Sequence, residues 1–205
     1  MPDTPELIDA ATAIEIFRKT YPRGGAIAEV EHIPRGFSHD VWLVRAAAGQ
    51  YSLHVSLVHA SPERLHNAIA AHRLISGARV PVPKILAWND GTLLGRPLHV
   101  QEWIPGQDAE VAWPALSPPT RVSIAHGFGR ALSRVHAIPG PHVGNVTYTK
   151  IAPSWSGELR AYLARNANRL RRLGLLSPAM LKEVVVRLES GIAGLTSTIQ
   201  PALTH

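Results

Sequence analysis

The sequence contains no cysteine among its 205 residues. Disulfides, cysteine-ligated zinc, iron–sulfur clusters and a cysteine nucleophile are therefore excluded. It also contains no apolar run of about 18 residues, the length that a membrane helix needs. The first residues have neither the basic segment nor the apolar segment of a signal peptide. These absences predict a cytoplasmic protein with no membrane partner, and any chemistry must come from other side chains.

Charged residues make up only 18% of the chain, yet the formal net charge is +6. The positive charge is concentrated between residues 160 and 172, where five arginines fall on one predicted helix. A solvated helix face is the interpretation that we favour, because no aromatic residues alternate with these arginines. A basic surface that binds nucleic acid is the alternative.

Several catalytic and metal-binding motifs are missing as well. The eleven histidines include no H-x-x-x-H pair, so the sequence predicts no metal site. There is no G-x-S-x-G turn and no G-x-x-x-x-G-K-[ST] loop, which argues against a hydrolase of that type and against a P-loop enzyme.

What the sequence does contain is an ordered series of helix and strand patterns, separated by Gly and Pro turns. A first helix is expected over 5–21, followed by three antiparallel strands at 26–33, 41–45 and 51–58. The next expected elements are a helix at 61–76 and strands at 85–88 and 97–104. After these only helices are expected, at 118–137, from 154 or 156 to 173, and at 178–199. This order predicts an α+β protein with a five-stranded antiparallel sheet.

Four segments sharpen that interpretation: Gly36-Phe37-Ser38-His39, Val80 to Leu86, Gln101 to Gly106, and Ala131 to Ile138. Together they resemble the aminoglycoside phosphotransferase-like family, small-molecule kinases of the protein-kinase-like fold. The resemblance implies a small lobe at 1–104 and an incomplete helical large lobe at 105–205. It also implies ATP and Mg²⁺ as cofactors and the hydroxyl of an unidentified small molecule as phosphate acceptor.

The same resemblance implies which residues bind the nucleotide. Gly36, Phe37 and Ser38 would lie over its phosphates, where a glycine lets backbone amides approach. The connector would contact the base, and the third strand would face the phosphates. The connector residues are Gln101, Glu102, Trp103 and Ile104, and the residue of the third strand is His54.

Two departures from the family pattern stand out. Kinases of this kind hold the phosphates with a lysine on the third strand. Here His54 occupies that place, and no lysine occurs between Lys19 and Lys84.

The second departure concerns the catalytic loop H-x-D-x-x-x-x-N, whose aspartate receives the proton of the acceptor. No histidine of the sequence is followed two positions later by aspartate, and His205 matches only the first residue of that loop. We therefore expect a chain truncated at the catalytic loop and inactive by itself. The alternative is a non-catalytic nucleotide-binding or regulatory module.

Overall fold

The computed structural model describes residues 7–34, 38–57, 62–140, 142–144, 146–147, 154–195 and 202. Contacts divide the chain into two compact units, Met1–Val135 and His136–His205. The first unit contains α1 (Ala10–Thr20), a 3₁₀ turn η1 (Pro22–Gly24), β1 (Ile27–Ile33), β2 (His39–Ala46), β3 (Gly49–Ser56), α2 (Pro62–Gly77), β4 (Ile85–Asn89), β5 (Leu98–Glu102), α3 (Ala109–Ala112), η2 (Trp113–Ala115) and α4 (Pro118–His136). The second contains α5 (Trp155–Leu173) and α6 (Pro178–Ala193).

The five strands form one antiparallel sheet in the order β1-β2-β3-β5-β4. Strand β5 lies between β3 and β4, so residues far apart in the sequence become direct neighbours. His54 of β3 is paired with His99 of β5, and Tyr51 with Glu102. The predicted five-stranded antiparallel sheet is confirmed.

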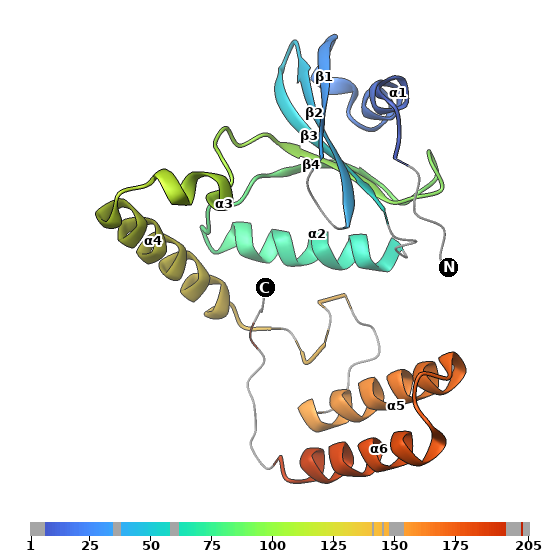
Figure 1. Ribbon diagram of the computed structural model, residues 1–205. Helices are drawn as coiled ribbons and strands as arrows, with labels where there is room; N and C mark the ends of the chain where they lie inside the picture. The colour runs from blue at the N-terminus through green and yellow to red at the C-terminus, as the bar shows by residue number, and fades with distance from the viewer. Residues whose placement is uncertain are drawn as a thin grey trace. The chain divides into compact units, whose positions relative to one another are not determined.

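One face of the sheet packs against α1 and forms the main hydrophobic core. Alternate residues of a strand point to opposite faces, and the residues that β2, β3 and β5 contribute to this core follow that period. They are joined by one side of α1, which lies over this face in Figure 1. The core consists of Ala13, Ile16, Phe17, Trp42, Val44, Tyr51, Leu53, Val55, Leu98 and Val100.

Helix α1 begins later than the sequence pattern predicts. The expected start at residue 5 is wrong in its described part, because residues 7–9 are not helical. Asp9 caps the helix instead, since its side chain accepts a hydrogen bond from the Thr12 amide at 2.7 Å. The preceding residue, Ile8, donates its amide proton to the buried carboxylate of Asp40.

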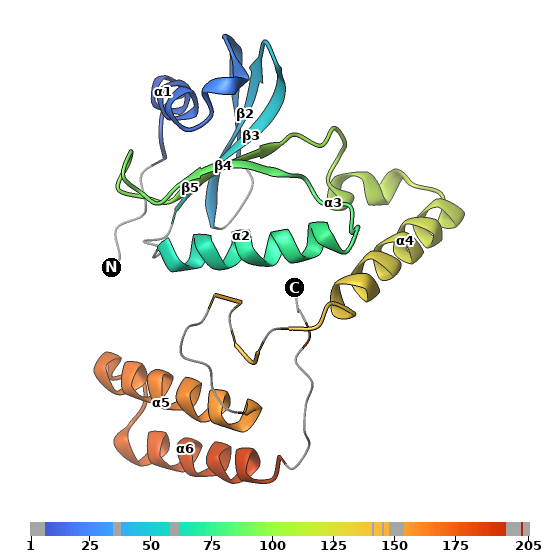
Figure 2. The ribbon, with the colours of Figure 1, turned by 180° about the vertical axis from the view of Figure 1, so that it is seen from behind.

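Helix α2 lies on the opposite side of the sheet from α1 in both Figure 1 and Figure 2. The His72 ring forms a hydrogen bond to the Pro83 carbonyl, and the Arg73 guanidinium lies 5.5 Å from the centre of the Trp88 ring. These contacts attach α2 to the segment that leads into β4 and to β4 itself. The second face of the sheet is therefore partly covered near β4.

The second unit is a pair of helices, as the sequence predicts. Both helices begin at a serine that accepts a backbone hydrogen bond, Ser154 for α5 and Ser177 for α6. Gly174 ends α5 in the left-handed conformation, at φ 63°, which favours glycine. No helix among the described residues is long and apolar enough to cross a membrane.

Candidate functional site

A cavity of about 340 Å³ opens on the face of the sheet opposite α1. It lies between β2 and β3 on one side and the segment that follows β5 on the other. Its walls mix apolar side chains with a few polar ones, as small-molecule sites do. The lining residues are Val41, Ser52, His54, Pro83, Gln101, Glu102, Trp103, Ile104, Gly106, Gln107 and Asp108.

The end of β5 and the connector after it are held by backbone hydrogen bonds to the residue before β4 and to β3. The Glu102 amide donates to the Lys84 carbonyl at 3.0 Å, and the Trp103 amide donates to the Gln50 carbonyl at 3.2 Å. The Ile104 amide, by contrast, donates to none of the described residues. An unpaired backbone donor at the rim of a cavity is available to a ligand that carries an acceptor.

His54 projects from β3 into this cavity. The His54 Nε2 lies 3.1 Å from the side-chain amide nitrogen (Nε2) of Gln101 and 3.2 Å from the Ser52 hydroxyl. An amide nitrogen can only donate, so in this arrangement Nε2 accepts and the proton of the neutral ring is on Nδ1. The His54 ring also stacks on His99, with centroids 4.7 Å apart.

The electrostatics of the site keep these rings neutral. Burial, and secondarily the neighbouring His39, lower the pKa of His54 to about 4. Burial, followed by His54 and His39, lowers the pKa of His99 to about 3, although a hydrogen bond with Gln101 opposes the shift. At neutral pH His54 therefore supplies a hydrogen-bonding ring to the cavity and no positive charge.

No lysine or arginine is among the described residues that line the cavity. Arg45, on the neighbouring strand, is bound by two carboxylates, Glu29 at 2.8 Å and Glu31 at 2.9 Å. Lys84 is largely exposed, and its Nζ lies 3.4 Å from Glu102 Oε1. The position on β3 that would carry a phosphate-binding cation thus holds a neutral histidine. The side chains of Arg45 and Lys84 are paired with carboxylates.

The structure brings five predicted site residues together around one cavity: His54, Gln101, Glu102, Trp103 and Ile104. Their binding of a nucleotide stays a prediction. Ser38 is exposed and is not among the lining residues. Gly36, Phe37 and His205 lie outside the described residues.

Sequence reasoning missed Val41 and Ser52, which line the cavity from neighbouring positions of β2 and β3. A signal was present for Ser52, because it lies two residues from His54 on the same strand. Residues two apart on a strand share a face.

Magnesium is the cofactor for which the described residues offer no site. None of them form a group of three or more His, Cys, Asp or Glu side chains able to hold a metal ion. We therefore assign none of the described residues to the Mg²⁺ that the family resemblance implies, and we derive no step through it.

The arginines of α5 are partly compensated by acidic neighbours. Arg160 pairs with Glu189 of α6 at 3.3 Å, and Arg165 pairs with Glu158 at 3.2 Å. Arg171 instead donates to the Asn168 side chain at 2.6 Å. Two of the five arginines of α5 are therefore paired with carboxylates.

The antiparallel sheet, the single helix after its third strand and the cavity beside the connector define the fold of the protein-kinase-like small-molecule kinases. The chain belongs to the phosphotransferase enzyme family, whose sequence profile matches residues 29–205. No curated protein matches the sequence.

Solved structures share this fold at low sequence identity. The GDP and kanamycin complex of APH(2")-IIia has a TM-score of 0.56 and 16% identity, over 88% of this chain and 59% of that one. A thermostable form of aminoglycoside phosphotransferase APH(4)-Ia, with ADP and hygromycin B, gives 0.58 and 11%, over 88% and 59%. A protein from Haemophilus somnus assigned as a fructosamine-3-kinase gives 0.56 and 11%, over 91% and 62%. The chain thus spans about three fifths of the length of these proteins.

Proposed function

We propose that the protein is the nucleotide-binding part of an ATP-dependent phosphotransferase that acts on a hydroxyl of a small molecule. The cavity between β3 and the connector is the observation that carries this proposal. Membership of the phosphotransferase family supports it, and so does the presence of GDP or ADP in two proteins of the same fold.

The connector end of the cavity suits a nucleobase. Pro83, Trp103 and Ile104 provide apolar surface for a flat ring, and the Ile104 amide provides a hydrogen-bond donor for its edge. Gln101 to Ile104 would therefore contact the base. A base held there leaves the ribose and phosphates to extend along β3.

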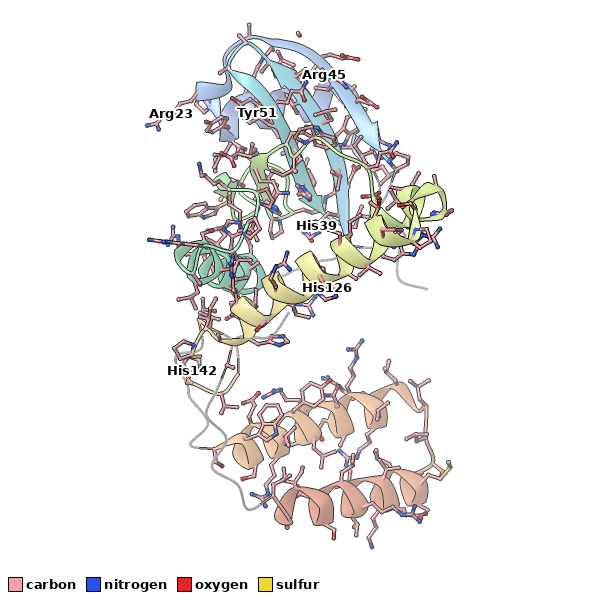
Figure 3. All side chains as sticks on the ribbon, turned by 90° about the vertical axis from the view of Figure 1, so that its left-hand side faces the viewer. Arg23, His39, Arg45, Tyr51, His126 and His142 are labelled. Atoms are coloured by element: carbon pink, nitrogen blue, oxygen red, sulfur yellow. The ribbon has the colours of Figure 1, made fainter. Side chains whose placement is uncertain are left out.

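The register of the strands supports one direction for the phosphates. Trp103 is bonded to Gln50 at the start of β3, whereas His54 lies four residues further along the same strand. The turn between β1 and β2 joins β2 at its His39 end, which is paired with Ser56 at the far end of β3. In Figure 3, His39 lies at one end of the strands, and Tyr51 and Arg45 lie towards the other. The phosphates would therefore lie between His54 and the His39 end of β2.

Phosphoryl transfer breaks the bond between the γ-phosphorus of ATP and the β–γ bridging oxygen, which leaves with ADP, and forms a bond to the acceptor oxygen, whose proton must go to a base. The sequence has no aspartate two residues after a histidine to act as that base. We therefore propose that these 205 residues bind the nucleotide and do not transfer phosphate by themselves. The acceptors would be small molecules, like the kanamycin and hygromycin B that are bound in proteins of the same fold.

Calorimetric titration with ADP tests the nucleotide site. We expect one saturable site, and we expect Val41→Trp to weaken binding at least tenfold because the indole fills the cavity. Val122→Trp, at an exposed position of α4, is the matched control and should bind ADP like the parent protein. Equal binding by the parent and Val41→Trp would contradict the assignment of the site.

Release of ADP from ATP and magnesium, in the presence of a panel of small alcohols and aminoglycosides, tests the catalytic statement. We expect no acceptor-dependent release from the 205-residue chain. Acceptor-dependent release would show that these residues already contain a catalytic base. The proposal that they bind the nucleotide without transferring phosphate would then be wrong.

The absence of a cation among the described lining residues also favours a second candidate, a regulatory module that recognises only the base. Such a module would bind adenosine and ATP with equal affinity at every pH. Tighter binding of ATP than of adenosine supports the phosphotransferase.

A further inference from the structure

Three histidines from three strands meet on the face of the sheet that carries the cavity. His39 of β2, His54 of β3 and His99 of β5 form this histidine cluster. Their ring centroids are 4.7 Å apart for His54 and His99, and 5.8 Å apart for His39 and each of the other two. Only His54 of the three lines the cavity. A ligand in the cavity therefore meets the cluster through His54.

The described side chains that contact the His54 ring carry no permanent charge. From β2 it is faced by His39 and from β5 by His99 and the Gln101 amide, while Ser52 of its own strand supplies a hydroxyl. His72, on α2, contributes to lowering the pKa of His99.

The charged side chains that line the cavity are acidic and lie at its connector end. Glu102 and Asp108 line it there, and Glu102 is paired with Lys84. None of the described carboxylates forms a hydrogen bond to the His54 ring.

Stacked rings cannot all become charged. A proton on one ring disfavours a proton on its neighbours, so a cluster at these distances accepts about one proton in the first step. A polyphosphate in the cavity reverses the preference for the neutral state at His54, because an anion within about 4–6 Å stabilises the imidazolium. The Gln101 side chain can follow, since rotation of its amide presents oxygen in place of nitrogen to the newly protonated Nε2.

We propose that His54 takes up a proton from solvent in mildly acidic solution when the phosphates of a nucleotide bind, so that the histidine cluster supplies a cation in the bound state alone. This inference rests on the proposed nucleotide site and describes its regulation by pH. His54 then takes the place of a permanent phosphate-binding cation, and its positive charge depends on the pH and on the bound phosphates. Acidification then favours binding.

The size of the effect follows from the electrostatics. Burial holds the pKa of His54 at about 4 in the free protein. A polyphosphate beside the ring raises this pKa, and a multiply charged anion acts at the upper end of the usual range. Binding should then take up between about 0.5 and 0.9 protons at pH 6 and almost none at pH 8. The affinity should fall between about twofold and tenfold from pH 6 to pH 8.

Calorimetric titration with ADP, in two buffers of different ionisation enthalpy, counts these protons at pH 6 and pH 8. ADP also titrates in this range, so the quantity of interest is the difference between the parent protein and His54→Gln. We expect the parent to take up at least about 0.5 proton more than the variant at pH 6 and an equal number at pH 8. His66→Gln, which removes an exposed histidine paired with Asp90, should match the parent.

Two further measurements separate this inference from the proposed function. His54→Lys carries a permanent charge, so it should bind ADP more tightly than the parent at pH 8 and show little dependence on pH. Adenosine has no phosphates and should bind without proton uptake by the parent. Equal proton counts for the parent and His54→Gln at pH 6 would overturn this inference and leave the nucleotide site standing. Failure of the parent to bind ADP at either pH would overturn both.

Discussion

Asp40 Oδ2 accepts a hydrogen bond from the backbone amide of Ile8 at 2.9 Å, 32 residues away in the sequence. The other carboxylate oxygen, Oδ1, lies 2.9 Å from His32 Nε2, and the Asp40 side chain is fully buried. One carboxylate on β2 therefore joins the segment before α1 to β1. We expect removal of a buried carboxylate with these partners to lower the free energy of unfolding far more than removal of an exposed one.

Replacement of Asp40 by alanine should lower the free energy of unfolding by about 3 kcal/mol, because the Ile8 amide and the His32 ring lose their buried partner. Urea denaturation measures this change. Asp90→Ala is the matched control, since Asp90 also lies 2.9 Å from a histidine, His66, but on the surface. The control should cost less than about 1 kcal/mol. Equal losses in the two variants would contradict the structural role of the buried pair.

The histidine cluster predicts a dependence of stability on pH. The folded protein keeps His54 and His99 neutral, with pKa values of about 4 and about 3, whereas both rings have a pKa near 6.5 when unfolded. Between those values the unfolded chain binds more protons, so stability is complete above pH 6.5 and is lost as the pH falls towards 4.

Denaturation at pH 7.5 and pH 5 checks this prediction. We expect a loss of about 1 kcal/mol or more for each ring at the lower pH. The double variant His54→Gln and His99→Gln should show a smaller loss over the same interval. If the double variant loses as much stability as the parent, other groups are responsible for the dependence.

Much of the fold was predictable because each element has local signals. The serine caps of α5 and α6 and the Pro residues around β4 mark boundaries that need no tertiary information. The short helix α3 was not predicted, since four residues carry too little periodicity. The end of β5 was placed two residues late, at 104, because the connector continues the apolar pattern while its backbone leaves the sheet at Glu102.

The site was only partly predictable for a different reason. The connector and His54 were expected from the family resemblance, which implies a role for the segment after the fifth strand and for one position on the third strand. The stack of His54 on His99 does not, because it depends on β5 rather than β4 pairing with β3. Strand order is a property of the whole sheet, and no local pattern around His99 encodes it.

The cap of α6 provides a test within the second unit. The Ser177 hydroxyl accepts from the Met180 amide at 3.2 Å, and Ser177→Ala should destabilise the helix by about 1 kcal/mol. Hydrogen exchange of the amides at 181–188 measures the local opening free energy. Ser190→Ala, at an exposed position inside α6, is the control and should leave the exchange unchanged or slower, since alanine favours helix. Equal acceleration in both variants would contradict the role of the cap.

The central claim is that a nucleotide occupies the cavity between β3 and the connector. Hydrogen exchange of the full 205-residue chain, with and without saturating ADP, tests it most directly. We predict slower exchange at Ser52 to His54 and at Glu102 to Ile104, with the largest change at the Ile104 amide, which is otherwise unpaired among the described residues. Unchanged exchange in both segments, or slower exchange confined to α5, would contradict the claim.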